Sequence, residues 1–176
     1  MPIVMLNTSD IQEITAVYHN SFPSEEADAT CNLMCALTRG KSQPETFAIG
    51  YRKDGRLVGA VGFSPVYFEH EQSISGYILA PLAVHSDFQR QGIATRMIEH
   101  GKKILTEKGV DVIFVYGDPK YYERYGFVAS LGELFIPPYP LEYPFGWQAM
   151  QLSKKTIKQA QYKFTCVPAL SDPSLW

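Results

Sequence analysis

The sequence predicts a mixed α+β domain in which helices flank one central, twisted sheet. Strand patterning fills most of residues 46–84, a helical pattern follows, and a further apolar strand comes directly after it. A strand, a helix and a strand in this order imply parallel pairing with a right-handed crossover. No repeat, low-complexity stretch or linker divides the chain. We therefore expect residues 1–176 to form a single domain around a mixed sheet.

The first part of the chain predicts a short strand followed by two helices. The strand is expected at Ile3–Leu6, where the side chains are apolar. Ser9 or Asp10 is suited to cap a helix that runs to Asn20. A second helix follows, and Gly40 marks its end.

The rest of the chain predicts strands and one long helix. Asp54-Gly55 is typical of a tight hairpin turn. Apolar residues recur with helical spacing over Gly92–Lys108, and a short helix capped by Asp118 should stop at Gly126. The strands are expected at Thr46–Tyr51, Arg56–Phe63 with its continuation Val66–Glu69, Gly76–Val84, Val112–Tyr116, Trp147–Leu152 and Tyr162–Val167.

Pro81 lies inside the run Gly76–Val84, which is apolar on both faces and is therefore expected to be a central strand. Proline lacks the N–H that a sheet ladder needs, so it favours a bulge or an edge at this point. Either would leave backbone donors near Leu82–Val84 free to bind a ligand. The alternative is that the strand simply ends at Pro81.

Composition and charge exclude several classes of protein. The chain has 16 basic and 18 acidic side chains, and this balance gives no electrostatic footprint for nucleic acid or for an anionic membrane. No apolar run is long enough to span a bilayer, and Met1–Asp10 lacks the pattern of a secretory signal, so we expect a cytoplasmic protein. Cys31, Cys35 and Cys166 have no disulfide or metal-ligand spacing, so we expect buried thiols and no metal.

The turn Gln89–Thr95 joins the central strand to the long helix and is a candidate anion site. The first N–H groups of a helix lack intrahelical partners and attract anions. Gly92 and Ala94 keep side chains away from this turn, while Gln89 and Arg90 add donors. Taken alone, close packing of helix on sheet explains the small residues equally well. No Gly-Lys-Ser/Thr follows and the third glycine of a dinucleotide fingerprint is missing, which excludes both of those motifs.

These motifs resemble those of the GNAT superfamily of acyl-CoA-dependent N-acyltransferases. The first family signature, Leu-x-Val followed by Gln/Arg-x-x-Gly-x-Gly/Ala, is matched by Leu82-Ala83-Val84 and by Gln89-Arg90-Gln91-Gly92-Ile93-Ala94. The second, Tyr-x-x-x-Gly-Phe, is matched by Tyr122–Phe127, and Gly117-Asp118-Pro119 ahead of Tyr121-Tyr122 resembles a functionally undescribed bacterial subgroup. The one departure is Ala94 at the last small position, which the family pattern admits.

The resemblance implies the GNAT fold and direct transfer of an acetyl or other acyl group from acetyl-CoA to a primary amine through a tetrahedral intermediate. A backbone N–H at or near Val84 would polarise the thioester carbonyl. Tyr122 would protonate the departing thiolate, with Tyr121 and Tyr125 as alternatives. The residues that it implies for CoA binding are Leu82, Ala83, Val84, Gln89, Arg90, Gln91, Gly92, Ile93, Ala94 and Thr95.

Three questions stay open at this level. The base that takes the amine proton could be Glu69, His70, Glu71, His85 or water. Each of these side chains is also compatible with an ordinary solvated residue. The stretch Ile136–Trp147 is rich in aromatic residues and proline. It could equally form a wall of the acceptor pocket, a loop that covers the sheet, or the contact of a homodimer. A non-catalytic acyl-CoA sensor is the alternative function.

Overall fold

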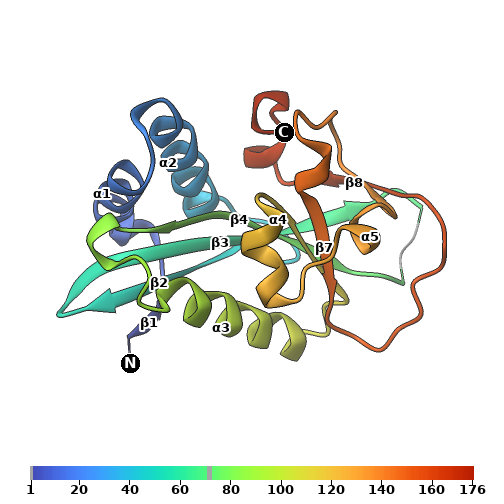
Figure 1. Cartoon of the computed structure of the whole chain (residues 1–176), viewed down its shortest axis with the longest axis horizontal. Coiled ribbons are helices and arrows are strands. Elements are labelled where there is room, and N and C mark those ends of the chain that lie inside the picture. Colours follow the sequence, from blue (N-terminus) through green and yellow to red (C-terminus); the bar gives the residue numbers. More distant parts are fainter. Residues whose placement is uncertain (1, 71–72) are drawn as a thin grey trace. The chain divides into compact units, whose positions relative to one another are not determined.

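The computed structural model describes residues 2–70 and 73–176. Its eight strands form a mixed sheet in the order β1-β2-β3-β4-β5-β7, with β8 paired to β3 and β6 paired to β8. Helices flank this sheet, so the expected fold class is confirmed (Figure 1). The chain divides into two compact units: residues 1–64 with 80–101, and residues 65–79 with 102–176.

The first unit is built on an antiparallel arrangement of β1 (Ile3–Met5), β2 (Phe47–Lys53) and the first part of β3 (Arg56–Phe68). Asp54 and Gly55 have φ angles of 50° and 77°, as the predicted hairpin turn requires. Helices α1 (Ile11–Ser21) and α2 (Ser24–Arg39) lie on one face of these strands, and α3 (Ile93–Glu107) begins on the other (Figure 1).

The start of α1 differs from the prediction. The side chain of Asn7 accepts the N–H of Ser9, while the carboxylate of Asp10 accepts the N–H of Asn7, and a short 3₁₀ turn, Thr8–Asp10, leads into the helix. Asp10, one of the two predicted caps, occupies the N-cap position of α1, but its side chain makes no cap bond to that helix. The capping box lies one turn earlier, at Asn7. The end of α2 at Gly40 is confirmed.

Strand β4 (Gly76–Val84) runs straight through Pro81, so the alternative that it ends there is wrong. The phenol of Tyr18 on α1 donates to the carbonyl of Pro81 at 2.8 Å and also lies 3.1 Å from the carbonyl of Ala60 on β3. Tyr18 is fully buried and belongs to the apolar core of this unit, where it connects the helix with two neighbouring strands.

The second unit contains the remaining strands. The start of β4 pairs in parallel with β5 (Val112–Tyr116), which confirms the predicted parallel pairing, and β7 (Trp147–Gln151) pairs with β5 in antiparallel fashion. β8 (Tyr162–Cys166) pairs with the end of β3. Two short elements were not predicted: α5 (Ala129–Gly132) and β6 (Phe135–Ile136). The core of this unit is aromatic and includes Phe68, Phe114, Phe135, Trp147 and Phe164.

Helix α4 (Pro119–Tyr122) begins as predicted. The carboxylate of Asp118 accepts the N–H of Lys120 at 3.0 Å, which caps the helix. A 3₁₀ turn, Glu123–Tyr125, continues it, and Gly126 stops it with a φ of 99°. The local sequence signals therefore fix both ends of the segment that carries the candidate tyrosines.

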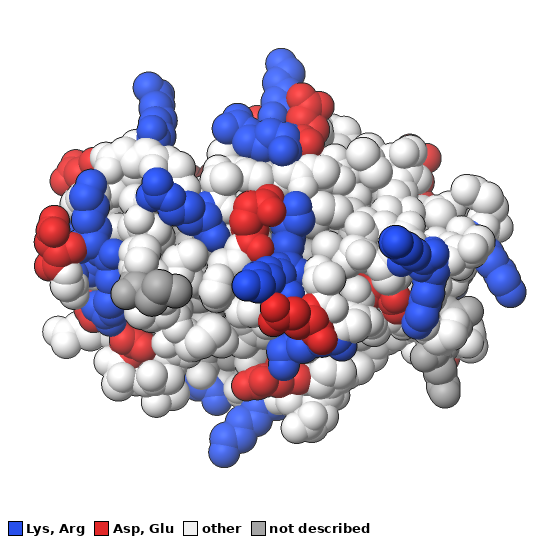
Figure 2. Space-filling model, turned by 90° about the horizontal axis from the view of Figure 1, so that it is seen from below, with Lys and Arg blue, Asp and Glu red and all other residues white. Residues whose placement is uncertain are grey.

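The surface charges are mixed on one face of the molecule (Figure 2), and the cysteine side chains are buried. Acidic and basic side chains are interspersed on the face shown in Figure 2. Cys31, Cys35 and Cys166 are buried free thiols, as predicted. Within residues 2–70 and 73–176, no helix combines the length and the apolar composition needed to cross a bilayer. The same residues contain no group of three or more His, Cys, Asp or Glu side chains that could hold a metal ion.

Candidate functional site

The turn before α3 has the backbone geometry of an anion site. Arg90 and Gly92 both adopt positive φ angles, 59° and 76°. A Cβ atom built on Gly92 would meet no described atom within 4 Å, so the space above this residue is open. The N–H of Arg96 donates to the carbonyl of Gly92 at 3.1 Å and closes the first helical turn. The N–H groups of Ile93 and Ala94 therefore lie outside the helix's own ladder.

Two glutamine side chains hold this turn in place. The amide of Gln89 donates to the carbonyl of Val84 at 3.1 Å, and that of Gln91 donates to the carbonyl of Asp87 at 3.3 Å. Lys53 in turn donates to Gln91 at 3.0 Å. Gln89 was expected to offer a donor to a ligand, but in the structure its amide, like that of Gln91, stabilises the turn itself.

Arg90 is the charged side chain that the turn presents to solvent. It is exposed, and it has no hydrogen bond or ion pair with any other described residue. Arg96, by contrast, donates to the hydroxyl of Tyr51 at 2.9 Å and lies over its ring. Of these two arginines, Arg90 is the one whose guanidinium group is available to an anion.

The predicted cofactor-binding residues fall into two sets. Ala83 and Ile93 are buried, so they could reach a ligand only through the backbone. The others are partly or fully accessible; they are Leu82, Val84, Gln89, Arg90, Gln91, Gly92, Ala94 and Thr95. All of them lie in the first unit, on the end of β4, in the turn before α3 and at the start of α3.

The end of β4 presents one accessible face. Ala80, Leu82 and Val84 are partly accessible, whereas the residues between them are buried. The pairing of β4 with β5 covers Gly76 to Ile78, and β4 then continues to Val84. The last part of the strand therefore lies beyond its paired stretch with β5.

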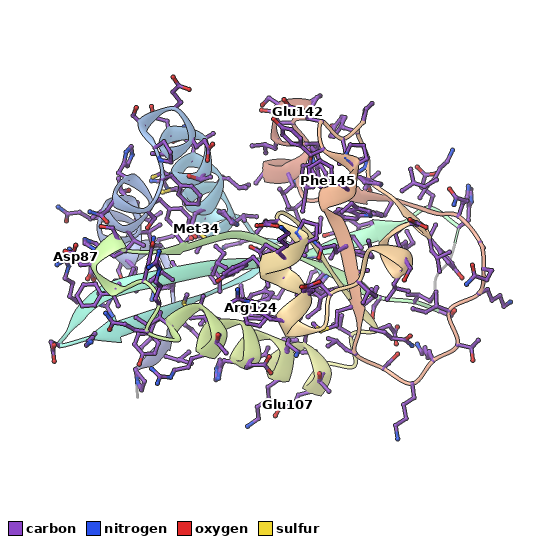
Figure 3. All side chains as sticks on the ribbon, viewed as in Figure 1. Met34, Asp87, Glu107, Arg124, Glu142 and Phe145 are labelled. Atoms are coloured by element: carbon purple, nitrogen blue, oxygen red, sulfur yellow. The ribbon has the colours of Figure 1, made fainter. Side chains whose placement is uncertain are left out.

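His85 is enclosed, which contradicts the expectation of a solvated side chain. It is 6% exposed, and its Nε2 lies 2.8 Å from a guanidinium nitrogen of Arg56. Its Nδ1 accepts the N–H of Asp87 at 3.2 Å. Because both ring nitrogens face donors of the protein, His85 is poorly placed to take a proton from an acceptor amine. The exposed carboxylate of Asp87 lies at the outer end of this turn (Figure 3).

Tyr122, in the second unit, has a ring that is held on several sides. A Cβ atom on Gly117 would stand 2.6 Å from its Cε2, so the ring lies directly over the backbone of Gly117. Its ring also contacts those of Tyr121 and Phe127, with centroids 4.9 and 5.9 Å away. Burial, followed by the neighbouring phenol of Tyr125, raises the pKa of Tyr122 well above its ordinary value.

The three candidate tyrosines differ in what their hydroxyl groups do. The hydroxyl of Tyr125 donates to that of Tyr121 at 3.4 Å, and the guanidinium of Arg124 lies 4.8 Å from the ring centroid of Tyr121. Burial and the bond to Tyr125 also raise the pKa of Tyr121. The hydroxyl of Tyr122 makes no hydrogen bond with any described residue, so it is the one of the three whose hydroxyl is not bonded to a neighbouring phenol.

The other candidate bases follow directly after strand β3 in the chain. Glu69 and His70 are exposed, and their side chains are 3.9 Å apart. Glu71 lies outside the described residues. Both described side chains therefore fit the prediction of solvated polar residues.

Two contacts that position the turn had no sequence signal. The side-chain oxygen of Asn20, at the end of α1, accepts both the N–H and the hydroxyl of Ser86, at 2.9 and 2.8 Å. Arg56, at the start of β3, holds the ring of His85. Both partners are distant in sequence, so only their three-dimensional arrangement reveals them.

Comparison with known protein families identifies the family of this chain. Residues 9–127 match the acetyltransferase (GNAT) family, a span that contains both the α3 turn and Tyr122. The chain belongs to the GNAT family of acetyltransferases. This membership confirms the predicted resemblance to the GNAT superfamily, and it makes the chain an acyltransferase that uses acetyl-CoA.

Individual relatives agree with this assignment. The chain is 33% identical over 154 residues to the "Uncharacterized N-acetyltransferase YjhQ" of Escherichia coli K12, covering 85% of this chain and 83% of that protein. A solved GNAT N-acetyltransferase from E. coli, YhbS in complex with CoA, has a TM-score of 0.76 and 25% identity, and the match covers 93% of this chain and 88% of the other. A GNAT acetyltransferase of Brucella melitensis in complex with acetyl-CoA shares the fold, with a TM-score of 0.67, 22% identity, and 96% and 97% coverage.

Proposed function

We propose that this GNAT acetyltransferase holds the diphosphate of acetyl-CoA at Gln89–Thr95 and transfers the acetyl group to a primary amine. The observation that carries the proposal is the turn before α3, where Arg90 and Gly92 adopt positive φ and the space above Gly92 is open. Helix N-termini bind phosphate groups through exposed N–H groups and the helix dipole. Arg90 adds a positive charge that no described residue neutralises. The CoA complex of the relative YhbS supports this assignment.

The accessible end of β4 is suited to the thioester. Strand residues that continue past a paired neighbour offer backbone N–H and C=O groups to an extended ligand. We assign the polarisation of the thioester carbonyl to a backbone N–H at or near Val84, because this end of β4 continues beyond its paired stretch with β5. A donor held rigidly in a sheet needs little reorganisation as negative charge develops on the oxygen.

Tyr122 is our candidate for the acid. The amine nitrogen attacks the thioester carbon, the C–S bond breaks, and the hydroxyl of Tyr122 gives its proton to the thiolate of CoA. The raised pKa keeps this phenol protonated at neutral pH, and its hydroxyl has no bond to another described residue. The amine loses its own proton to Glu69, His70 or water, since the ring of His85 is already engaged.

The direct test measures binding and turnover separately. Calorimetry with CoA should show binding that weakens when Arg90 is replaced by Gln, and release of CoA thiol from acetyl-CoA should require an amine. Arg39→Gln is the matched control, because Arg39 is an exposed arginine at the end of α2 in the same unit. Binding of CoA without thiol release for any primary amine would favour the non-catalytic sensor. Equal loss of affinity in both variants would contradict the assignment of Arg90.

Location and assembly are further parts of the proposal. We propose a cytoplasmic enzyme, since its donor acetyl-CoA is a cytoplasmic metabolite. A homodimer is also proposed, and sedimentation of the purified chain tests it directly.

A further inference from the structure

We propose that the acetyl acceptor is an amine carrying an aromatic group, which packs on the rings of Tyr143 and Phe145. This inference rests on the proposed function and names the substrate class of the same enzyme. Four large apolar side chains are exposed among the described residues: Met5, Val128, Tyr143 and Phe145. The two aromatic ones belong to one turn before β7, with exposed fractions of 54% and 68% and ring centroids 6.0 Å apart.

This aromatic turn is held rigidly. The N–H of Tyr143 donates to the hydroxyl of Tyr116 at 2.7 Å, and the N–H of Gly146 donates back to the carbonyl of Tyr143 at 2.9 Å. Pro144 begins the 3₁₀ turn and fixes its first φ angle. Exposed rings on a rigid turn lose little conformational entropy when a ligand packs on them. The exposure of Phe145 is therefore built into the backbone.

The layer beneath the turn is also aromatic. Tyr116 stacks on Trp176 with a centroid separation of 6.4 Å, and Trp176 contacts Trp147 at 5.9 Å. The indole of Trp176 is buried and donates to the carbonyl of Leu170 at 2.9 Å. The rings of Trp147 and Trp176 are thus enclosed, whereas those of Tyr143 and Phe145 are exposed.

The aromatic turn adjoins the segment that positions Tyr122. The N–H of Gly117 donates to the carbonyl of Gly146 at 2.9 Å, and the side chain of Gln148 donates to both of their carbonyls at 3.2 Å. The ring of Tyr122 lies over this same Gly117. One short piece of backbone therefore connects the proposed acid with the exposed rings.

Charge favours an amine as the occupant. Glu142 precedes the two rings, is exposed, and forms no ion pair with any described residue (Figure 3). An amine reaches the enzyme mainly as an ammonium ion at neutral pH, and an ammonium ion is attracted both to a carboxylate and to the face of an aromatic ring. A carboxylate next to two exposed rings suits a small aromatic amine better than an acidic or purely aliphatic molecule.

The test compares pairs of amines that differ in an aromatic group. Phenethylamine with ethylamine, and benzylamine with methylamine, are offered with acetyl-CoA, and kcat/KM is measured by thiol release. We expect the aromatic member of each pair to react with at least about 10-fold higher kcat/KM. Phe145→Ala should remove most of that preference, Phe145→Tyr should retain it, and KM for acetyl-CoA should stay the same in both. Val128→Ala, which removes an exposed apolar side chain from the same unit, serves as the control.

The possible failures are distinguishable. Equal kcat/KM for both members of each pair, unchanged by Phe145→Ala, would overturn this inference and leave the transferase activity standing. Absence of thiol release with every amine, although CoA binds, would overturn the proposed function and the inference together. A change in sedimentation of Phe145→Ala without a change in amine preference would assign the rings to a contact between two copies of the chain.

Discussion

The ring of Tyr122 lies so close to Gly117 that a Cβ atom added at Gly117 would stand 2.6 Å from its Cε2. Non-bonded carbon atoms do not approach to that separation, so a side chain at this position must displace the ring. Gly117 therefore fixes where the hydroxyl of Tyr122 stands. The N–H of Gly117 also donates to the carbonyl of Gly146 in the aromatic turn, so Gly117 contacts both the proposed acid and that turn.

Replacing Gly117 by Ala should impair catalysis without impairing cofactor binding. A displacement of about 1 Å in a reacting group can lower the rate about 100-fold. We expect kcat to fall by that order, while KM for acetyl-CoA changes little, since the proposed CoA residues lie elsewhere in the chain. Steady-state kinetics measures both values. A kcat equal to that of the unchanged protein would show that the position of Tyr122 does not matter for turnover.

Tyr122→Phe removes the proposed acid and keeps the ring. We expect kcat to fall about 100-fold or more, as for the loss of a general acid, with CoA affinity nearly unchanged. Tyr125→Phe is the matched comparison, because it removes a neighbouring hydroxyl that is bonded to Tyr121. If both variants lose the same activity, or if Tyr122→Phe loses none, Tyr122 is not the acid.

The pH dependence follows from the raised pKa of Tyr122. Burial, the largest cause, shifts this pKa upward, so the phenol stays protonated as pH rises through the ordinary tyrosine range. An acid must be protonated to act, so its activity is lost only above that raised pKa. We therefore expect no fall in kcat due to Tyr122 up to about pH 10. A pH–rate profile checks this, and an alkaline fall below pH 9 that disappears in Tyr122→Phe would contradict it.

Gly92 and Gly109 form a natural pair for testing the anion site. Both have a φ of 76°, and a Cβ atom at either would meet nothing within 4 Å. Substitution by Ala should cost each about 1–2 kcal/mol of backbone strain. Only Gly92→Ala should also raise KM for acetyl-CoA, because only Gly92 lies at the helix start. Urea unfolding and steady-state kinetics separate the two effects, and equal KM values in both variants would remove the phosphate site from this turn.

Asp111 makes a separate contribution to stability. Burial alone would raise its pKa, but the N–H of Ser75, the side chain of Ser153 and the ammonium of Lys155 together lower it. A lowered pKa stabilises the fold above the unfolded value of about 3.9, and that stabilisation is lost as pH falls through the folded value. Asp111→Asn should cost about 1–3 kcal/mol at pH 7. The difference in unfolding free energy should shrink below pH 4, and a constant difference would contradict the role of the charge.

Elements with local signals could be predicted from the sequence. The Asp54-Gly55 turn and the Asp118 cap depend only on residues next to each other in the chain. At the start of α1 the local rule was insufficient, because four consecutive residues, Asn7–Asp10, can all cap a helix. The side chain of Asn7 caps the 3₁₀ turn that precedes the helix, whereas that of Asp10 makes no cap bond to α1. α5 and β6 are too short to show a periodic pattern.

The backbone segments that form the candidate site could be predicted from the sequence. The contacts made by their side chains could be predicted less well. The family signature located the α3 turn and the tyrosine segment, whereas the use of Gln89 and Gln91 inside the turn depends on where Val84 and Asp87 present their carbonyls. The distinction between Tyr122 and its neighbours depends on one contact between hydroxyl groups. The contact between His85 and Arg56 joins residues that no local pattern connects.

The buried cysteines have a practical consequence for measuring this enzyme. Burial raises the pKa of Cys166 to about 12 and also raises that of Cys31, so hardly any thiolate is present at the pH of an assay. Thiolate is the form that attacks disulfide reagents such as Ellman's reagent, and Cys35 is likewise enclosed. The protein should therefore contribute almost no colour of its own. Slow acceptors can be screened with a large amount of enzyme, and the signal will still report the CoA that is released.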